Sequence, residues 1–157
     1  MNIVEYCEKY NEEIVELVLD IENNESKINL SLEEQPDLMD IRGTFINGEG
    51  NFWVAVDNEE VIGTIGLVIK ENHCGVLKKF FVRADWRSKK TGLALYKILL
   101  EYAKSRNLES LILDTPSVAK AAHRFYERAG FHRVTADQLP VHYEYPDRDS
   151  DLYMLTL

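Results

Sequence analysis

The sequence predicts a mixed α/β fold in which a mostly antiparallel sheet of about seven strands is flanked by about four helices. Two observations predict it. Short runs rich in aromatic and β-branched residues recur along the chain and are typical of strands. Between several of these runs, apolar residues follow the helical period and indicate amphipathic helices. We expect one domain over residues 1–157, because no repeat, low-complexity segment or linker interrupts the pattern.

The first part of the chain predicts a strand, two helices and an antiparallel hairpin. Apolar residues from Ile14 to Ile21 follow an i, i+3, i+4, i+7 pattern, which places them on one helix face. A second helix is expected to start at Pro36, where the missing N–H leaves no bond unmade. Gly63 and Gly66 indicate a bulge or a close approach of another group. The expected elements are a strand over 2–6, helices over about 10–24 and from 36 to near 47, and strands over 51–57 and 61–70.

The second part of the chain predicts a βαβαβ unit and a closing strand. Residues 108–114 form a nearly continuous apolar run, which is typical of a strand buried on both faces. A strand, a helix and a strand with short links imply a right-handed crossover and a parallel strand pair. Gly130 is expected to end the last helix, and an exposed closing strand offers an edge at which a homodimer could form. The expected elements are strands over 77–82, 108–114, 131–135 and 152–157, and helices over 92–102 and 118–129.

A basic loop between the strand at 77–82 and the following helix predicts an anion site. Seven of the eighteen Lys and Arg residues fall between Lys78 and Lys97, against the single acid Asp85. The loop runs from Arg87 to Gly92 and opens a helix, whose first N–H groups and positive dipole end favour a phosphate. The alternative is a solvated basic turn that caps the helix.

Composition argues against several classes of protein. The net charge of −9 and the sequence pI of 4.9 disfavour non-specific binding to nucleic acid. No apolar run reaches the roughly 18–20 residues that cross a bilayer, and the acidic first residues do not resemble a signal peptide. The two cysteines, Cys7 and Cys74, lack metal-type spacing. We therefore expect no metal, no membrane contact and a reduced, cytoplasmic protein.

Two stretches 34 positions apart carry a family resemblance. Arg87 to Gly92 reads R-S-K-K-T-G between a strand and a helix, and Ala121 to Phe131 reads A-A-H-R-F-Y-E-R-A-G-F. Together they resemble the two signatures of the GNAT superfamily of acyl-CoA-dependent N-acetyltransferases, R/Q-x-x-G-x-G/A and A-x-x-F-Y-E-x-x-G-F. Lys90 replaces the first glycine; a lysine fits there if its φ is negative, and its ammonium could pair with a phosphate. The resemblance covers residues 50–135 and the expected element order.

The resemblance implies that acetyl-CoA is the co-substrate. The backbone of the strand ending at Val82 would bind the pantetheine arm, as a strand edge binds a peptide. The loop amides would hold the pyrophosphate with help from charged side chains, and Arg124 would reach a phosphate of CoA. The implied cofactor-binding residues are Phe80, Phe81, Val82, Arg87, Ser88, Lys89, Lys90, Thr91, Gly92 and Arg124.

The resemblance also implies direct acetyl transfer to a primary amine of a small molecule or peptide. The tyrosine that matches Tyr126 lies near the thioester sulfur and protonates the leaving thiolate, whereas Phe125 is expected in the core. The general base stays open. Glu33 and Glu34 are candidates, although the segment that begins at Ser31 also fits a capping box. Asp114 is another candidate, because it ends a buried strand.

Two other interpretations stay open, and the acceptor is not encoded. A domain of this fold could bind acyl-CoA as a regulatory module without turnover. A nucleotide-phosphate-binding protein could use the basic loop, although the P-loop pattern is absent. Residues 23–45 and 136–151 are expected to shape the acceptor pocket, and acidity outside the basic loop favours a cationic amine. Polar candidates in these segments are Gln35, Asp37, Tyr143 and Tyr145.

Overall fold

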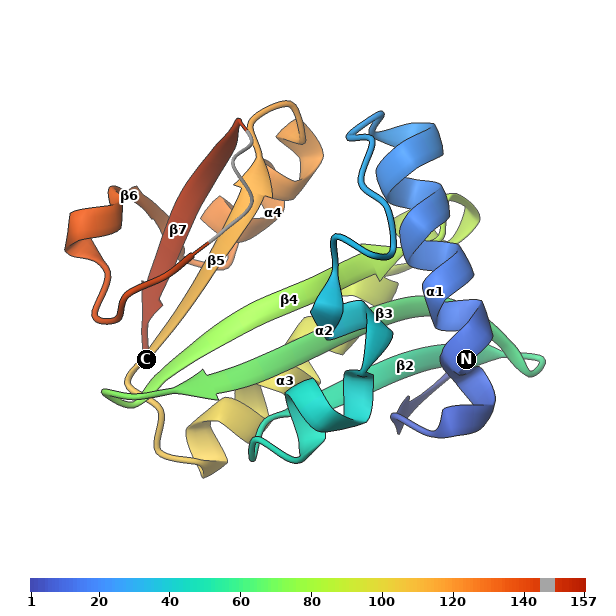
Figure 1. Cartoon of the computed structure of the whole chain (residues 1–157), viewed down its shortest axis with the longest axis horizontal. Helices are drawn as coiled ribbons and strands as arrows, with labels where there is room; N and C mark the ends of the chain where they lie inside the picture. Colours follow the sequence, from blue (N-terminus) through green and yellow to red (C-terminus); the bar gives the residue numbers. More distant parts are fainter. Residues whose placement is uncertain (145–148) are drawn as a thin grey trace.

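A computed structural model describes residues 1–144 and 149–157, and it shows a seven-stranded sheet with helices on both faces (Figure 1). The strands are β1 (Asn2–Glu5), β2 (Asn51–Asp57), β3 (Glu60–Lys70), β4 (Cys74–Val82), β5 (Ser110–Pro116), β6 (His132–Val134) and β7 (Ser150–Thr156). The α-helices are α1 (Asn11–Asp20), α2 (Pro36–Met39), α3 (Thr91–Ser105) and α4 (Lys120–Arg128). Shorter helical turns are η1 (Glu8–Tyr10), η2 (Ile21–Glu25), η3 (Arg42–Ile46), η4 (Ala84–Lys89) and η5 (Ala136–Gln138). The expected mixed α/β fold is confirmed.

The sheet has the strand order β1-β2-β3-β4-β5-β7-β6. Neighbouring strands are antiparallel except β4 and β5, which pair in parallel. Helix α3 makes the connection between these two strands, as the strand–helix–strand order predicted. The sheet therefore changes from a meander to a crossover at β4.

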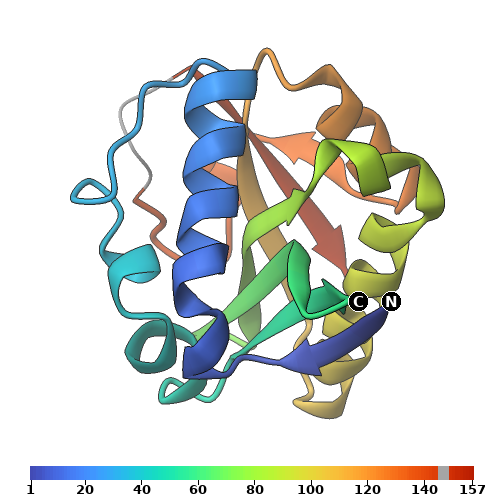
Figure 2. The ribbon, with the colours of Figure 1, turned by 90° about the vertical axis from the view of Figure 1, so that its right-hand side faces the viewer.

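Helices α1 and α2 cover one face of the sheet, and α3 and α4 cover the other (Figure 2). Ile14 and Val18 of α1 are fully buried against Phe52 of β2. Leu95 and Leu99 of α3 are fully buried in the core on the opposite face. Each such side chain contributes about 1.5–3 kcal/mol by leaving water. The helical apolar stripes thus position the two layers.

Strands β4 and β5 separate after a short paired stretch. They pair only at Cys74 with Ser110, Gly75 with Leu111, and Val76 with Ile112. Beyond these pairs β5 continues alongside β7, while β4 continues alongside β3, so an opening widens between β4 and β5 (Figure 1). This opening is the feature around which the site is built.

A bulge in β4 lies at the start of the opening. Between the pairs Gly66–Lys78 and Thr64–Phe81, β4 contains one more residue than β3. Lys79 takes up the extra length with φ +54°, and the Thr64 hydroxyl donates a 2.7 Å hydrogen bond to its carbonyl. Bulges re-aim side chains next to functional sites. The close approach expected at Gly66 is also confirmed, because a Cβ there would lie 2.6 Å from the Phe45 ring.

The expectation of one continuous second helix was wrong. The chain leaves helical geometry at Asp40 (φ −143°, ψ 77°), between α2 and η3. The Asp40 carboxylate accepts a 3.0 Å hydrogen bond from the Gly43 N–H, as a capping residue does at a new helix start. A short side chain competing for backbone N–H groups therefore divides the helix.

The expectation of an exposed closing strand was also wrong. Strand β7 lies between β5 and β6, with Leu152 paired to Asp114 on one side and to Val134 on the other. The short strand β6 folds back after α4 and covers the edge that β7 would otherwise expose. The described edges of the sheet are β1 and β6. The edge of β7 from Leu152 to Met154 is therefore already paired within the chain and is not free to form a homodimer.

Residues 1–144 and 149–157 contain neither a candidate membrane-spanning helix nor a candidate metal site. No helix in these ranges is long and apolar enough to cross a bilayer. No group of three or more His, Cys, Asp and Glu side chains in them is arranged to hold a metal ion. Burial raises the pKa of the Cys74 thiol, which keeps it protonated and unreactive.

Candidate active site

The backbone of β4 presents one edge to the opening. Beyond Val76, β4 pairs with β3 on one side and with no described strand on the other. The side chains of Phe80 and Val82 pack on the α3 face and that of Phe81 on the α1 face. These residues therefore offer the opening their peptide groups. Such an edge can hold an extended amide-bearing chain as it would hold another strand.

The basic loop passes through η4 and ends at the first residue of α3. Lys90 caps α3 in the left-handed conformation, with φ +62° and ψ 19°. The negative φ that would let a lysine fit here without strain is therefore not observed. The chain turns sharply at Lys90 before α3 begins. Glycine adopts the left-handed conformation of such a turn without steric cost. The Thr91 hydroxyl is buried and has no hydrogen-bond partner within the described residues, so a polar group at the start of α3 is left unsatisfied.

Arg87 is held between the end of β4 and the end of the α1 segment. Its Nε donates a 2.8 Å hydrogen bond to the carbonyl of Val82, and its Nη2 lies 2.6 Å from a carboxylate oxygen of Glu25 in η2. Both side chains are partly exposed. The sequence did not predict the contact with Glu25, because it joins segments about sixty positions apart.

The remaining residues of the basic loop before α3 lie at the surface. Ser88, Lys89 and Lys90 are exposed. The Lys89 ammonium lies 4.4 Å from the centroid of the Trp86 ring. Arg124 is exposed on α4. These cations are open to an anionic ligand in solvent.

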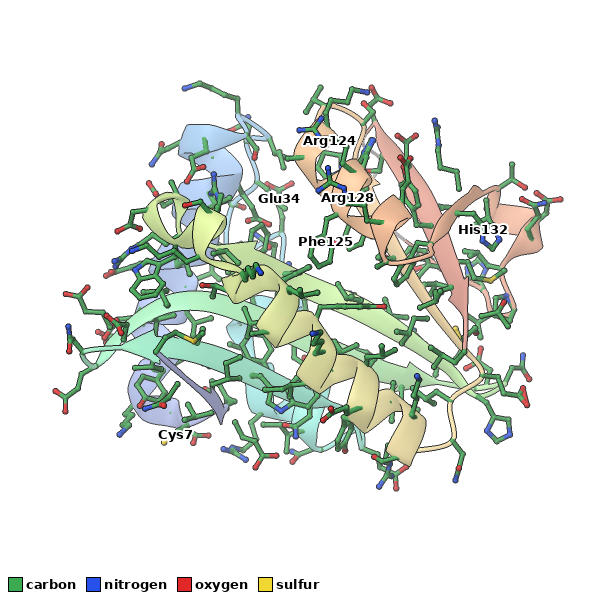
Figure 3. All side chains as sticks on the ribbon, turned by 180° about the vertical axis from the view of Figure 1, so that it is seen from behind. Cys7, Glu34, Arg124, Phe125, Arg128 and His132 are labelled. Atoms are coloured by element: carbon green, nitrogen blue, oxygen red, sulfur yellow. The ribbon has the colours of Figure 1, made fainter. Side chains whose placement is uncertain are left out.

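Tyr126 of α4 is buried deeper than its neighbour Phe125. Tyr126 is 6% exposed, and its ring lies 6.3 Å from that of Phe80 on β4 and 5.6 Å from that of Phe131. Phe125 is only half-buried and extends from α4 toward Phe80 and Tyr96 (Figure 3). The expectation that Phe125 is the better core residue was wrong, because α4 packs Tyr126 against Phe80 of β4 and Tyr153 of β7.

Burial raises the pKa of Tyr126, and the charge of Asp114 raises it further. Asp114 lies two residues after Ile112 and therefore on the face of β5 opposite to α4. Its negative charge is nevertheless close enough to act on the Tyr126 hydroxyl. A phenol with a raised pKa stays protonated at neutral pH. The Tyr126 hydroxyl therefore keeps a proton that it can donate.

The two glutamates proposed as bases lie in the connection between η2 and α2. Both are exposed. The Glu34 carboxylate accepts a 3.1 Å hydrogen bond from the backbone N–H of Ser31, and the Ser31 hydroxyl accepts one from the Glu34 N–H at 3.3 Å. This is the reciprocal pattern of a capping box. The capping box that was the alternative to a catalytic Glu34 is thus observed. The catalytic roles of Glu33 and Glu34 stay predictions.

Asp114 has a partner that the sequence did not reveal. The Tyr143 hydroxyl donates a short hydrogen bond to an oxygen of the Asp114 carboxylate. Burial and the charge of Asp114 raise the pKa of Tyr143, so this hydroxyl stays a donor. The nearby Tyr145 lies outside the described residues.

A second cluster of polar contacts, which the sequence did not reveal, surrounds Asp37. The ammonium groups of Lys78 and Lys79 each lie 3.4 Å from the same Asp37 oxygen. Lys79 also donates to Gln35 at 2.6 Å, and the Gln35 amide donates to Glu22 at 2.8 Å. Two adjacent lysines interrupt the alternation of apolar and polar residues in this strand. That interruption could have indicated a bulge that places both lysine side chains on one face.

Comparisons with known proteins agree with this architecture. The family model described as "Acetyltransferase (GNAT) family" matches residues 7–131. A GNAT-family acetyltransferase from Staphylococcus aureus Mu50 is 34% identical, with a TM-score of 0.95 over 99% of this chain and 98% of that chain. An acetyltransferase from Streptococcus agalactiae 2603 is 35% identical, with the same TM-score and coverage.

Curated relatives are similar over part of their length. N-acetylaspartate synthetase of Danio rerio is 34% identical over 100 residues, which are 62% of this chain and 36% of that protein. The protein called "Probable N-acetyltransferase camello" of Xenopus tropicalis is 29% identical over 107 residues, which are 66% of this chain and 49% of that protein. The chain therefore spans about a third to a half of the curated relatives it matches.

The sheet that opens between β4 and β5, with a loop and helix at its end, is the architecture of an acyltransferase of the GNAT type. The chain belongs to the GNAT family of acetyltransferases. The resemblance inferred from the two sequence stretches is confirmed.

Proposed function

We propose that the protein is an N-acetyltransferase that moves the acetyl group of acetyl-CoA to a primary amine of a small molecule or peptide. One observation carries the proposal: the backbone edge of β4 beyond Val76 faces the opening and leads directly to the loop that starts α3. Acetyl-CoA is a long thioester with amide groups along its arm and phosphates at its end, so the arm matches the β4 edge and the phosphates match the loop. A PaiA N-acetyltransferase from Thermoplasma acidophilum, 16% identical with a TM-score of 0.76, was solved in complex with coenzyme A, which agrees with the choice of ligand.

The binding roles follow from the elements. The peptide groups of Phe80 to Val82 would bind the pantetheine arm, and the N–H groups of Ser88 to Gly92 would bind the pyrophosphate. The unsatisfied Thr91 hydroxyl and the exposed lysines at 89 and 90 support an anion at this loop. Arg87 would help only after leaving Val82 or Glu25, because it is already engaged there. Arg124 would add a charge from α4.

The chemistry needs one donor and one acceptor of protons. The amine nitrogen forms a bond to the thioester carbonyl carbon, and a backbone N–H near Val82 stabilises the oxyanion. As the C–S bond breaks, Tyr126 gives its proton to the thiolate, and the second proton that the nitrogen loses on becoming an amide restores the Tyr126 phenol. We favour Asp114 as the base over Glu33 and Glu34, because Asp114 borders the opening between β4 and β5 whereas both glutamates are exposed in the connection between η2 and α2.

Thermal unfolding with and without acetyl-CoA tests the binding. Saturation at about 100 times Kd should add roughly 2.7 kcal/mol, or on the order of 5–10 °C for a domain of this size. Desulfo-CoA should give a similar shift and ATP should not. A panel of amines should then be tested for acetylation, and it should include aspartate because several curated relatives are named N-acetylaspartate synthetase. No shift with any CoA species would contradict the proposal.

A regulatory domain that binds acyl-CoA without turnover is the second candidate. It is favoured by the engagement of Arg87 with Val82 and by the lysine at 90 in place of glycine. A thermal shift with acetyl-CoA but no acetylation of any amine would support it. Acetylation of any amine above the uncatalysed rate would exclude it.

A further inference from the structure

The α1 and α2 face of the opening carries opposite charges on its two sides. Val76 of β4 and Ile112 of β5 are the last paired residues, and both pack into the same apolar cluster as Val141. Because side chains alternate along a strand, Lys78 and Asp114 are the next residues on this face. They therefore lie on either side of the opening at the point where the strands part.

The Asp114 side is a fixed hydrogen-bond acceptor. The Tyr143 hydroxyl donates to one oxygen of the carboxylate and orients it. Tyr143 packs against the cluster that contains Val141 and Ile112. A carboxylate oriented in this way by one phenol has its remaining lone pairs available to accept hydrogen bonds from a ligand group.

The Lys78 side of the opening carries an accessible ammonium group. Asp37 is shared by Lys78 and Lys79, each 3.4 Å from one oxygen. Lys79 is the more buried of the two, with its side chain 12% exposed, and it also donates to Gln35. The side chain of Lys78 is 33% exposed. Lys79 is linked through Gln35 to the buried carboxylate of Glu22 as well as to Asp37. Lys78 contacts Asp37 and is the more accessible of the two ammonium groups, so it can bind a second anion.

We propose that the acceptor is an amino acid with a free carboxylate, whose ammonium is received by Asp114 and whose carboxylate is bound by Lys78. The inference rests on the proposed acetyl transfer and names its substrate class. Asp114 takes the proton that the ammonium must lose before the nitrogen attacks. Lys78 orients the molecule so that this nitrogen faces the opening. Polyamines and other amines without a carboxylate would make no ion pair with Lys78, which would then contact only Asp37.

Equilibrium binding in the presence of CoA tests the carboxylate requirement without turnover. L-alanine is compared with L-alaninamide, and L-aspartate with L-asparagine, so that each pair differs by one carboxylate. In at least one pair, the acid is expected to bind about tenfold or more tightly than the amide, because the site is built for that group and is only partly exposed to water. Equal binding within both pairs, or a preference for 1,4-diaminobutane over all four, would overturn the inference.

Variants of Lys78 assign the effect to one side chain. Lys78→Met should abolish the preference for the acid over its amide in whichever pair the wild type distinguishes. Lys78→Glu should shift binding toward 1,4-diaminobutane. Asp37 keeps Lys79 as a partner in both variants, and an unchanged thermal shift with CoA checks the fold. Lys97→Met removes an exposed lysine on α3 and should leave the preference unchanged. A preference that survives in Lys78→Met would contradict the assignment.

The outcomes separate this inference from the proposed function. Selective binding of the acid without acetylation supports the amino acid site and contradicts turnover. Acetylation of acid and amide at equal rates contradicts the site and supports turnover. A protein that binds neither CoA nor any amine contradicts both.

Discussion

At the scale of single residues, Tyr126 is the side chain on which thiolate departure depends in the proposed reaction. Tyr126→Phe removes only the hydroxyl and should lower kcat by about 10²–10⁴-fold, as loss of a general acid does, with little change in KM for acetyl-CoA. Steady-state kinetics measure both constants. Tyr102→Phe is the matched control, because that hydroxyl donates to the Glu49 carbonyl at the far end of α3. Equal kcat values in wild type and Tyr126→Phe would contradict the assignment.

Glu25 is the carboxylate that pairs with Arg87 of the basic loop. Glu25→Gln removes the charge paired with Arg87 and should lower the Kd for CoA up to about fivefold, since a partly exposed ion pair contributes up to about 1 kcal/mol. Titration calorimetry measures the Kd. Glu16→Gln removes the same charge from the exposed side of α1 and is the control for long-range electrostatics. A weaker affinity in Glu25→Gln would instead mean that Glu25 positions Arg87 productively.

At the scale of elements, the start of α3 carries backbone strain. Lys90 has φ +62°, and an L-residue in this conformation costs about 1–2 kcal/mol, whereas glycine costs about 0.5–1 kcal/mol in the unfolded chain. Lys90→Gly should therefore raise the free energy of unfolding by up to about 1 kcal/mol, or about 2–4 °C in Tm. Denaturant and thermal unfolding measure it.

Lys90→Ala separates strain from charge in the same loop. The alanine removes the ammonium and keeps the unfavourable φ, so its stability should stay near that of the wild type. If Lys90→Ala stabilises the protein as much as Lys90→Gly, relief of charge repulsion and not of backbone strain is the cause. Comparing the Kd for CoA in the two variants also measures what the ammonium contributes to binding.

At the scale of the whole molecule, two buried phenols link stability to alkaline pH. Burial and Asp114 raise the pKa of both Tyr126 and Tyr143 in the folded state. The folded protein then binds more protons than the unfolded chain above the ordinary tyrosine pKa of about 10, so stability is full below that pH and falls as pH rises. Denaturant unfolding between pH 8 and 11 measures the slope.

The control for this pH dependence removes one phenol. Tyr126→Phe should reduce the alkaline slope while Tyr102→Phe should not, because Tyr102 lies in a partly exposed position. An unchanged slope in Tyr126→Phe would show that this tyrosine does not ionise with unfolding. The same argument predicts no loss of kcat from Tyr126 ionisation below about pH 10.

Local patterns were enough to predict most elements. The helical stripe from Ile14 to Ile21, the apolar run before Asp114 and the glycine at 130 depend on neighbouring residues alone, and the structure has α1, β5 and the end of α4 where they indicated. Gly130 has φ +101°, as its C′ position requires. The family could also be inferred, because both of its signatures are contiguous in sequence.

The tertiary structure decided the contacts between distant segments. Glu25 reaches Arg87, Tyr143 reaches Asp114, and Asp37 is shared by two lysines only because a bulge places both on one face. The local sequence pattern could not determine which of Tyr126 and Phe125 is more deeply buried, because the surrounding elements decide that. By itself the sequence determined the element order and the acyltransferase family, which arise from local hydrophobic pattern and contiguous motifs. The polar lining of the opening depends on where β4 and β5 part, and only the packed sheet determines that point.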